Sequence, residues 1–171
     1  MTPTLRFVTS SPEETQSLGE LIGRQAQPGD IYLLTGPLGA GKTCLSQGVA
    51  RGLEVPENLR SPTFVLMARH QGRLLLHHLD LYRLNDPWEA WDLGLDDELF
   101  GQGVCVVEWA DKAEELFPPE SCWIDLDYGE TESMRVVMVS ASSPRFRSLL
   151  TRLKSSYDVG LRPAPGNEGS Q

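Results

Sequence analysis

The sequence predicts a single α/β domain with a mixed, mostly parallel sheet, an antiparallel hairpin and helices on both faces. Two observations carry this prediction. Helical apolar patterns alternate with short β-rich runs, the order that builds parallel sheets. A glycine-rich loop also joins a strand-like run, residues 31–34, to a helix-like run, residues 43–51. The length of 171 residues suits one domain.

The first half of the chain can be assigned from the signals at the ends of its elements. Ser11-Pro12-Glu13-Glu14 forms a capping box with proline at the first helical position. The helix that it starts carries an apolar stripe with helical spacing and ends at Pro28-Gly29. The strand, the glycine-rich loop and a helix closed by Gly52 follow. Two β-rich runs on either side of Gln71-Gly72 then predict a hairpin.

The second half continues the alternation. Asp86, Pro87 and Glu89 repeat the capping pattern and predict another helix. Residues 104–107 form a short apolar run that predicts a buried strand, and residues 122–128 and 134–140 predict two more. A basic helix covers residues 144–155. We expect residues 1–156 to form the domain and residues 157–171, rich in glycine, proline and polar side chains, to be a disordered tail.

The glycine-rich loop carries the main chemical signal. Gly36, Gly41, Lys42 and Thr43 fit the pattern G-x-x-x-x-G-K-[ST], in its required place between a strand and a helix. Glycines let successive backbone N–H groups face a phosphate chain, and the helix N-terminus adds the positive end of its dipole. Lys42 reaches the β- and γ-phosphates, and the Thr43 hydroxyl can ligate Mg²⁺. The pattern predicts a P-loop NTPase-like fold.

A second acidic residue is expected near the metal, at the carboxyl end of a strand beside the loop. Glu108 follows four apolar residues, and Asp80 follows a similar run. The alternatives are a solvated strand end for Glu108 and a turn or cap residue for Asp80. Thr63, in the segment Arg60–Phe64, stands where nucleotide switches place a threonine that senses the γ-phosphate, although Ser-Pro is also a common turn opener.

Three more side chains near these positions, His77, His78 and Trp109, bear on the site. His78 shares a strand face with Asp80, so it is either a hydrogen-bonded partner near the phosphates or a core histidine. His77 points to the other face, which excludes one metal held by both histidines. Trp109 follows Glu108 at a strand end, where it either covers a nucleotide or closes the core.

Composition limits the partners and the compartment. The net charge of −9 repels a phosphate backbone, so RNA would be gripped by a partner protein. Cys44, Cys105 and Cys122 form no C-x-x-C pair and predict neither disulfides nor a zinc site. No run approaches the roughly 18 apolar residues of a membrane span, and the first ten residues lack the apolar stretch of a signal peptide. We expect a cytoplasmic protein that does not contact a membrane.

Four motifs occur together in a distinctive order. "GPLGAGKT", "SPTF", "HLDLYRL" and "VEW" resemble the bacterial TsaE (YjeE) family, the ATPase of the tRNA threonylcarbamoyladenosine pathway. The resemblance runs from about Ser11 to about Val139. It implies that residues 1–156 are a P-loop ATPase domain with slow intrinsic hydrolysis, that ATP and Mg²⁺ are its ligands, and that it works with the partners TsaB and TsaD. Contact with tRNA would then be indirect, through the complex.

The resemblance also implies roles for individual residues. The triphosphate would be held by Gly36, Leu38, Gly39, Ala40, Gly41, Lys42 and Thr43. Thr43 and Glu108 would hold Mg²⁺, and Asp80 would be needed for hydrolysis, together with Lys42, Glu108 and the candidate switch residue Thr63. Trp109 would cover the nucleotide, and Ser11 would lie near the adenine. The chain departs from the usual family loop at Pro37, which removes one backbone N–H and an acidic side chain, and at Cys44, where a second threonine is common.

Two other functions use the same loop. A small-molecule kinase usually carries a lid with several arginines over the transferred phosphoryl group. No arginine-dense segment of that kind occurs here, and Arg69, Arg73 and Arg83 are scattered. A GTP-dependent switch usually carries an Asn-Lys-x-Asp element, which is absent from the sequence. The kinase remains the alternative to the ATPase.

Overall fold

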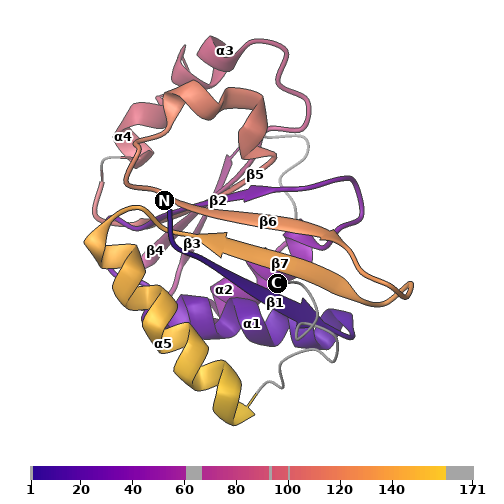
Figure 1. Cartoon of the computed structure of the whole chain (residues 1–171). Coiled ribbons are helices and arrows are strands. Elements are labelled where there is room, and N and C mark those ends of the chain that lie inside the picture. The colour runs from indigo at the N-terminus through magenta and orange to yellow at the C-terminus, as the bar shows by residue number, and fades with distance from the viewer. Residues whose placement is uncertain (1, 61–66, 93, 100, 161–171) are drawn as a thin grey trace.

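A computed structural model describes residues 2–60, 67–92, 94–99 and 101–160. Within these residues seven strands form one sheet, in the order β1-β7-β6-β2-β5-β4-β3 (Figure 1). The strands are β1 (Thr4–Thr9), β2 (Ile31–Thr35), β3 (Met67–Gln71), β4 (Leu75–Asp80), β5 (Val104–Glu108), β6 (Cys122–Tyr128) and β7 (Arg135–Ser140). The α/β fold predicted from the sequence is confirmed.

The sheet is parallel at its centre and antiparallel towards both edges. β6, β2, β5 and β4 are parallel neighbours. The predicted hairpin is confirmed as the antiparallel pair β3–β4. A second antiparallel group, β6–β7 and β7–β1, forms the other edge. The mixed sheet is therefore as predicted, but the antiparallel share is larger than one hairpin supplies.

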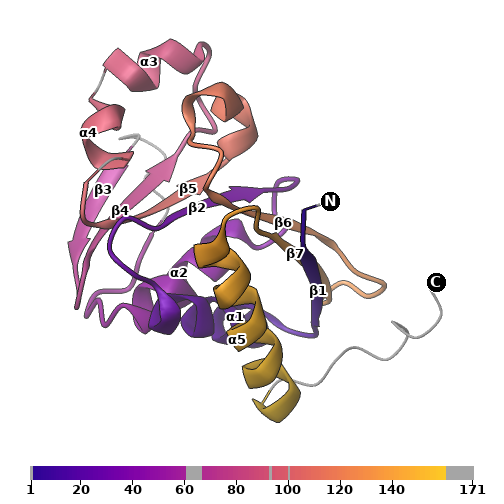
Figure 2. The ribbon, with the colours of Figure 1, turned by 60° about the vertical axis from the view of Figure 1, so that its left-hand side comes forward.

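Helices cover both faces of the sheet (Figures 1 and 2). α1 (Pro12–Gln25), α2 (Lys42–Gly52) and α5 (Pro144–Gly160) lie on one face, and α3 (Pro87–Asp92), α4 (Leu95–Leu99) and a 3₁₀ helix, η1 (Ala110–Leu116), lie on the other. The single helix predicted to start at Pro87 is found as two short ones, α3 and α4, and η1 was not predicted. α5 continues beyond the expected end at residue 155. No helix of the described ranges is long and apolar enough to cross a membrane. The predicted disorder of the tail falls largely on residues 161–171, which lie outside the described residues, and stays a prediction.

The capping box predicted at the start of α1 is present. The Ser11 hydroxyl accepts a hydrogen bond from the Glu14 N–H, and the Glu14 carboxylate accepts one from the Ser10 N–H. The first bond satisfies a donor that a helix start otherwise leaves unpaired, and the second ties the residue before the cap to the first turn, one position earlier than in the standard capping box. They fix where α1 begins.

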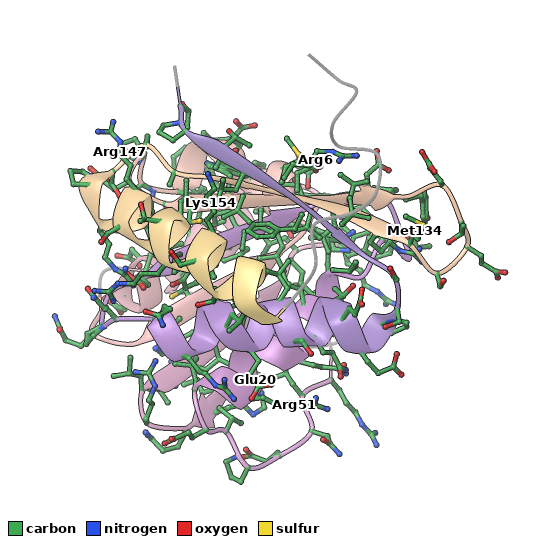
Figure 3. The ribbon with its side chains drawn as sticks, turned by 60° about the horizontal axis from the view of Figure 1, so that its bottom comes forward. Arg6, Glu20, Arg51, Met134, Arg147 and Lys154 are labelled. Atoms are coloured by element: carbon green, nitrogen blue, oxygen red, sulfur yellow. The ribbon has the colours of Figure 1, made fainter. Side chains whose placement is uncertain are left out.

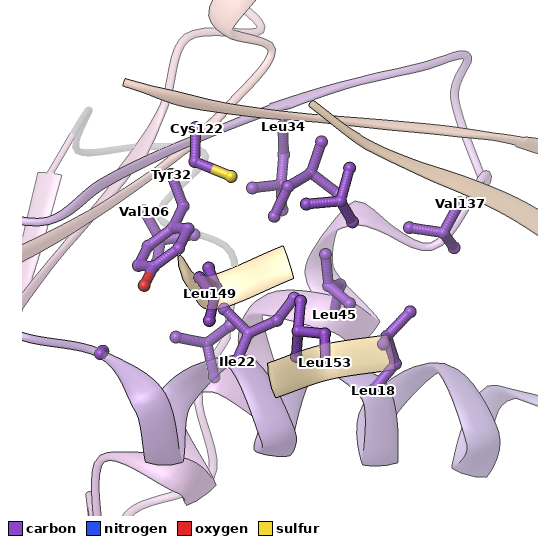
Figure 4. Packing of buried hydrophobic residues seen from close by; sticks show 14 of the residues in the cluster. Leu18, Ile22, Tyr32, Leu34, Leu45, Val106, Cys122, Val137, Leu149 and Leu153 are labelled. Carbon is purple, nitrogen blue, oxygen red and sulfur yellow. The ribbon is translucent and has the colours of Figure 1, made fainter. Parts of the chain in front are cut away.

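Two buried clusters fill the space between the sheet and its helices. Figure 4 shows the larger one, in which Leu18, Leu45 and Leu153 of the three helices meet Tyr32 and Leu34 of β2. The alternate residues of β2, Ile31 and Leu33, belong to the cluster on the opposite face. Because successive strand residues point to opposite faces, β2 is buried on both sides. The strand that precedes the glycine-rich loop therefore lies inside the fold, between the two clusters.

The helices α1 and α2 approach each other closely through glycines. A Cβ atom added to Gly48 of α2 would lie 2.1 Å from the backbone oxygen of Gln16, and one added to Gly19 of α1 would lie 2.3 Å from the oxygen of Leu45. Real Cβ atoms do not approach backbone atoms this closely. The helix that follows the loop is thus held tightly against α1.

A buried ionic cluster fastens α5 to the amino end of β2. Arg145 Nη2 lies 2.6 Å from Asp30 Oδ2, and the Tyr32 hydroxyl donates to the same oxygen at 2.8 Å. Burial, followed by the neighbouring Asp30 carboxylate, raises the pKa of Tyr32 well above its usual range. Asp30 is only 4% exposed, so these partners replace the water that would otherwise bind its carboxyl oxygens.

Candidate functional site

The parallel strands bring the predicted site residues to one edge of the sheet. Asp80, the last residue of β4, lies opposite Glu108, the last residue of β5. Glu108 in turn lies opposite Leu34 of β2, directly before the loop. Carboxyl ends of parallel strands are where open α/β sheets bind their ligands. The loop and both candidate carboxylates therefore converge.

The glycine-rich loop has the backbone that its sequence requires. Gly36 and Gly41 have φ angles of +137° and +104°, which side-chain-bearing residues rarely adopt. A Cβ on Gly36 would also lie 2.1 Å from the backbone oxygen of Leu126 in β6. α2 begins at Lys42, directly after the loop. The N–H groups of its first turn have no acceptor within the helix and face the concave side of the loop.

The Lys42 side chain folds back over the loop. Its Nζ donates to the carbonyl oxygens of Gly36 and Pro37 at 2.5 and 2.9 Å, and lies 3.8 Å from the centre of the Trp109 ring. Burial lowers the pKa of the Lys42 ammonium. Several nearby acidic groups oppose this shift, and the Glu108 carboxylate has the strongest effect among them. The Lys42 ammonium thus lies at the opening of the loop, bound to neutral carbonyl oxygens and an aromatic ring. An anion in the loop could replace these partners.

Thr43, Glu108 and His78 form a chain of short hydrogen bonds. The Thr43 hydroxyl donates to Glu108 Oε1 at 2.7 Å, and His78 Nε2 lies 2.5 Å from Glu108 Oε2. Glu108 is 2% exposed and His78 is fully buried. Glu108 is therefore not a solvated strand end, and His78 has the hydrogen-bonded position that was one of its two interpretations.

Asp80 makes the turn contact expected of one interpretation and also lines a pocket. Its Oδ1 accepts a hydrogen bond from the Tyr82 N–H at 2.9 Å, which is the turn-capping contact. It also lines a pocket of about 370 Å³ with Lys42, Thr43, Glu108 and other residues. The turn contact therefore holds a buried carboxylate beside Glu108.

Trp109 closes one side of this pocket. Its backbone has φ 58°, an uncommon value for a residue other than glycine. The ring packs against Tyr82, with centroids 4.8 Å apart, and against Lys42. The unusual backbone turns the aromatic ring over the site, immediately after the strand that positions Glu108.

A second pocket, of about 640 Å³, shares loop residues with the first. Gly39, Gly41 and Cys44 line both. The remaining lining residues of the second pocket come from the start of α1 and from the β6–β7 connection: Pro12, Thr15, Thr131, Glu132, Ser133 and Arg135. Ser11 caps α1 next to this pocket but is not among its lining residues.

Three other predicted positions differ in their placement. Leu38 lines the first pocket and is 68% exposed, whereas the side chain of Ala40 is buried. Thr63 lies outside the described residues. Among the residues that the sequence did not indicate, Tyr82 and Arg135 line the two pockets and Tyr128 contacts the loop. No local motif marks Tyr128 or Arg135, because both reach the loop from distant strands.

Comparison with known proteins agrees with the geometry. A family model described as threonylcarbamoyl adenosine biosynthesis protein TsaE matches residues 9–137. The chain is 40% identical over 156 residues to the tRNA threonylcarbamoyladenosine biosynthesis protein TsaE of Bacillus subtilis, covering 91% of this chain and 97% of that protein. The protein of the same name from Treponema pallidum is 38% identical over 133 residues, covering 78% of this chain and 93% of its own.

A solved structure has the same fold. The crystal structure of YdiB from Bacillus subtilis superposes with a TM-score of 0.77 at 35% identity, covering 91% of this chain and 97% of that one. The resemblance carried by the four sequence motifs is thereby confirmed. The chain belongs to the TsaE family of threonylcarbamoyl adenosine biosynthesis proteins.

Proposed function

We propose that this protein binds ATP with Mg²⁺ and hydrolyses it slowly, and that it acts with TsaB and TsaD in forming threonylcarbamoyladenosine at position 37 of tRNA. One observation carries the proposal. Lys42, Thr43, Asp80 and Glu108, which come from the start of α2 and two strand ends, line one pocket. Membership of the TsaE family supports the pathway, and the pocket supports the chemistry.

The phosphate chain would lie along the loop. Backbone N–H groups of the loop and of the first turn of α2 would donate to it. The Lys42 ammonium, now hydrogen-bonded to two neutral carbonyl oxygens, would exchange them for phosphate oxygens. A phosphate oxygen adds the attraction of opposite charges, which a neutral carbonyl oxygen does not offer the ammonium, so this exchange favours binding.

Thr43 and Glu108 fit a magnesium site that is completed by other oxygens. Their oxygens lie 2.7 Å apart, so both can face one small cation. The described residues contain no cluster of three or more His, Cys, Asp or Glu side chains that could hold a metal alone. This matches Mg²⁺, which takes one or two protein ligands and fills its shell with water and phosphate oxygens. When bound, the ion neutralises charge on the β- and γ-phosphates.

The buried carboxylates have separate tasks. His78 holds Oε2 of Glu108, which directs Oε1 towards Thr43. Asp80 lies beside Glu108, held by the N–H of Tyr82, where it would position the attacking water or the ion for the reaction. The two pockets share the loop, so the adenosine would occupy the second pocket, next to the capped start of α1.

A first experiment tests nucleotide binding. Calorimetric titration with ATP should show binding to the wild-type chain and loss of binding for Lys42→Ala. Lys154→Ala is the matched control, because it removes the same charge from an exposed position on α5 (Figure 3). Affinity of Lys42→Ala equal to that of Lys154→Ala would refute the phosphate-loop interpretation.

A second experiment tests the pathway and the partners. We expect TsaB and TsaD to raise the rate of phosphate release by completing or ordering the site. A tenfold rise needs about 1.4 kcal/mol of extra transition-state stabilisation, which one added hydrogen bond can supply. Thr63→Ala should lower the stimulated rate more than the basal rate. If the partners leave the rate unchanged and repeated rounds of tRNA modification proceed equally well without this protein, the assignment to this pathway is wrong. A small-molecule kinase then becomes the preferred function.

A further inference from the structure

The β6–β7 hairpin lies along the outer side of the phosphate loop. The backbone oxygen of Leu126 in β6 comes so close to Gly36 that a side chain there would not fit. Two residues further along β6, the Tyr128 hydroxyl lies 3.6 Å from where a Cβ of Gly39 would stand. The loop is therefore enclosed from outside by a strand that contributes nothing to the signature pattern.

Two side chains of this hairpin bind carbonyl groups of the loop. The Tyr128 hydroxyl donates to the Leu38 carbonyl, and Arg135 Nη2 donates to the Gly39 carbonyl at 3.3 Å. Tyr128 and Arg135 face each other in the β6–β7 register, and the guanidinium lies 5.2 Å from the Tyr128 ring centre. They form a single unit that holds two successive peptide groups.

Arg135 is itself fixed within the hairpin. Its Nη1 donates to the carbonyl oxygens of Glu132 and Met134, both at 2.7 Å. Tyr128 is 52% exposed, so water could partner its hydroxyl, but that hydroxyl instead donates to the loop. The contacts with the loop therefore come from a braced support and not from two free surface side chains.

The orientation of a peptide group explains what these contacts do. In a trans peptide the C=O and the following N–H point in opposite directions. Turning the carbonyls of Leu38 and Gly39 outward therefore turns the N–H groups of Gly39 and Ala40 inward. The Ala40 N–H follows this direction and donates across the loop to the Pro37 carbonyl at 3.1 Å, which a phosphate oxygen would have to replace as its acceptor. Tyr128 and Arg135 thus fix the direction of the N–H groups of Gly39 and Ala40 before a ligand arrives. This lowers the conformational entropy that binding would cost.

We propose that Tyr128 and Arg135 are positioning residues, which hold the Leu38 and Gly39 peptides so that the loop presents its N–H groups to the phosphate chain. This inference rests on the proposed binding of ATP. It assigns a role in phosphate recognition to a hairpin about 90 residues away from the loop in the chain.

The test compares ligands with and without phosphates. Tyr128→Phe removes only the hydroxyl, and Arg135→Gln removes the long donor. Arg147→Gln is the control, because it makes the same change of charge on α5, far from Met134 in Figure 3. Calorimetry should show ATP and ADP binding roughly three- to tenfold more weakly to the first two variants, as loss of one hydrogen bond predicts. Adenosine, measured by its competition with ADP, should bind as to the wild type.

The outcomes separate positioning from general support. Unchanged ATP affinity in Tyr128→Phe would overturn the inference, and so would an equal loss for adenosine and ATP. Equal losses in Arg135→Gln alone would show that Arg135 acts as a lining residue of the second pocket and would overturn its positioning role. If the wild-type chain binds no ATP, the proposed function fails, and the inference is then judged by amide hydrogen exchange. Residues 38–41 should exchange faster in Tyr128→Phe than in the wild type, and equal rates would overturn it.

Discussion

The close contact between α1 and α2 makes Gly48→Ala a sharp test of the packing. An added Cβ would lie 2.1 Å from the Gln16 oxygen, about 1.3 Å short of the 3.4 Å at which ordinary contact begins. Both partners at this point are helix backbone, so neither can move aside as a flexible side chain would. The helices must therefore separate by about 1 Å.

The cost can be worked out from the side chains at the junction. Leu18 and Ile22 of α1 and Leu45 and Val49 of α2 belong to one fully buried cluster. A gap of about 1 Å removes a quarter to a half of the attraction between facing atoms, on the order of 1 kcal/mol for each side chain. Alanine returns about 1 kcal/mol, because it favours helix more than glycine does. We expect a net loss of about 3 kcal/mol.

Urea denaturation followed by circular dichroism measures this loss, and thermal unfolding should show a midpoint lower by about 6–12 °C. Ser148→Ala is the control, because it places alanine at an exposed helical position of α5 and should change stability by less than about 0.5 kcal/mol. α2 starts at Lys42, so the displaced helix should also weaken ATP binding. A Gly48→Ala variant as stable as the wild type would show that helix propensity outweighs the contact and would refute the packing argument.

Three further predictions concern single side chains. Glu108→Gln keeps the shape but removes the charge, so it should weaken ATP binding in Mg²⁺ by at least about tenfold and change it much less in excess EDTA; equal losses would exclude a role through the metal. Asp80→Asn should leave the ATP affinity within about threefold and slow phosphate release by at least about tenfold, and a normal rate would restrict Asp80 to its turn contact. Tyrosines of the unfolded chain ionise near pH 10, whereas the buried Tyr32 of the folded protein ionises at a higher pH because its pKa is raised. The stability that Tyr32 contributes is therefore present below about pH 10. It declines above that pH by up to about 1.4 kcal/mol per pH unit. Urea titrations from pH 8 to pH 11 should therefore give a shallower alkaline decline for Tyr32→Phe, and identical slopes would contradict this.

The site was largely predictable because its signals are local. The spacing of Gly36, Gly41 and Lys42 depends on one turn of backbone, and the carboxyl-end rule for parallel strands places Asp80 and Glu108 beside it. The Thr43–Glu108 hydrogen bond follows from these two facts together. The roles of these residues in binding and hydrolysis remain predictions.

The supporting contacts were not predictable, since they join residues far apart in the sequence. Tyr128 and Leu38 are 90 positions apart, and Arg145 and Asp30 are 115 apart. Both contacts depend on strand order and register, which no single stretch of sequence encodes. η1 was not predicted for a local reason. It starts after Trp109, whose backbone is in the left-handed conformation, and no side chain caps it.

The pairing of β1 has a consequence for how the protein is made. β1 occupies one edge of the sheet and pairs with β7, so that Thr4 lies opposite Ser140. α5, which follows β7, supplies Arg145 to the buried Asp30 and Leu153 to the core. During synthesis on the ribosome, β1 is therefore made long before the strand that pairs with it. β1 stays unpaired while the strands between it and β7 are synthesised, so this edge of the sheet closes only after the parallel centre has been made.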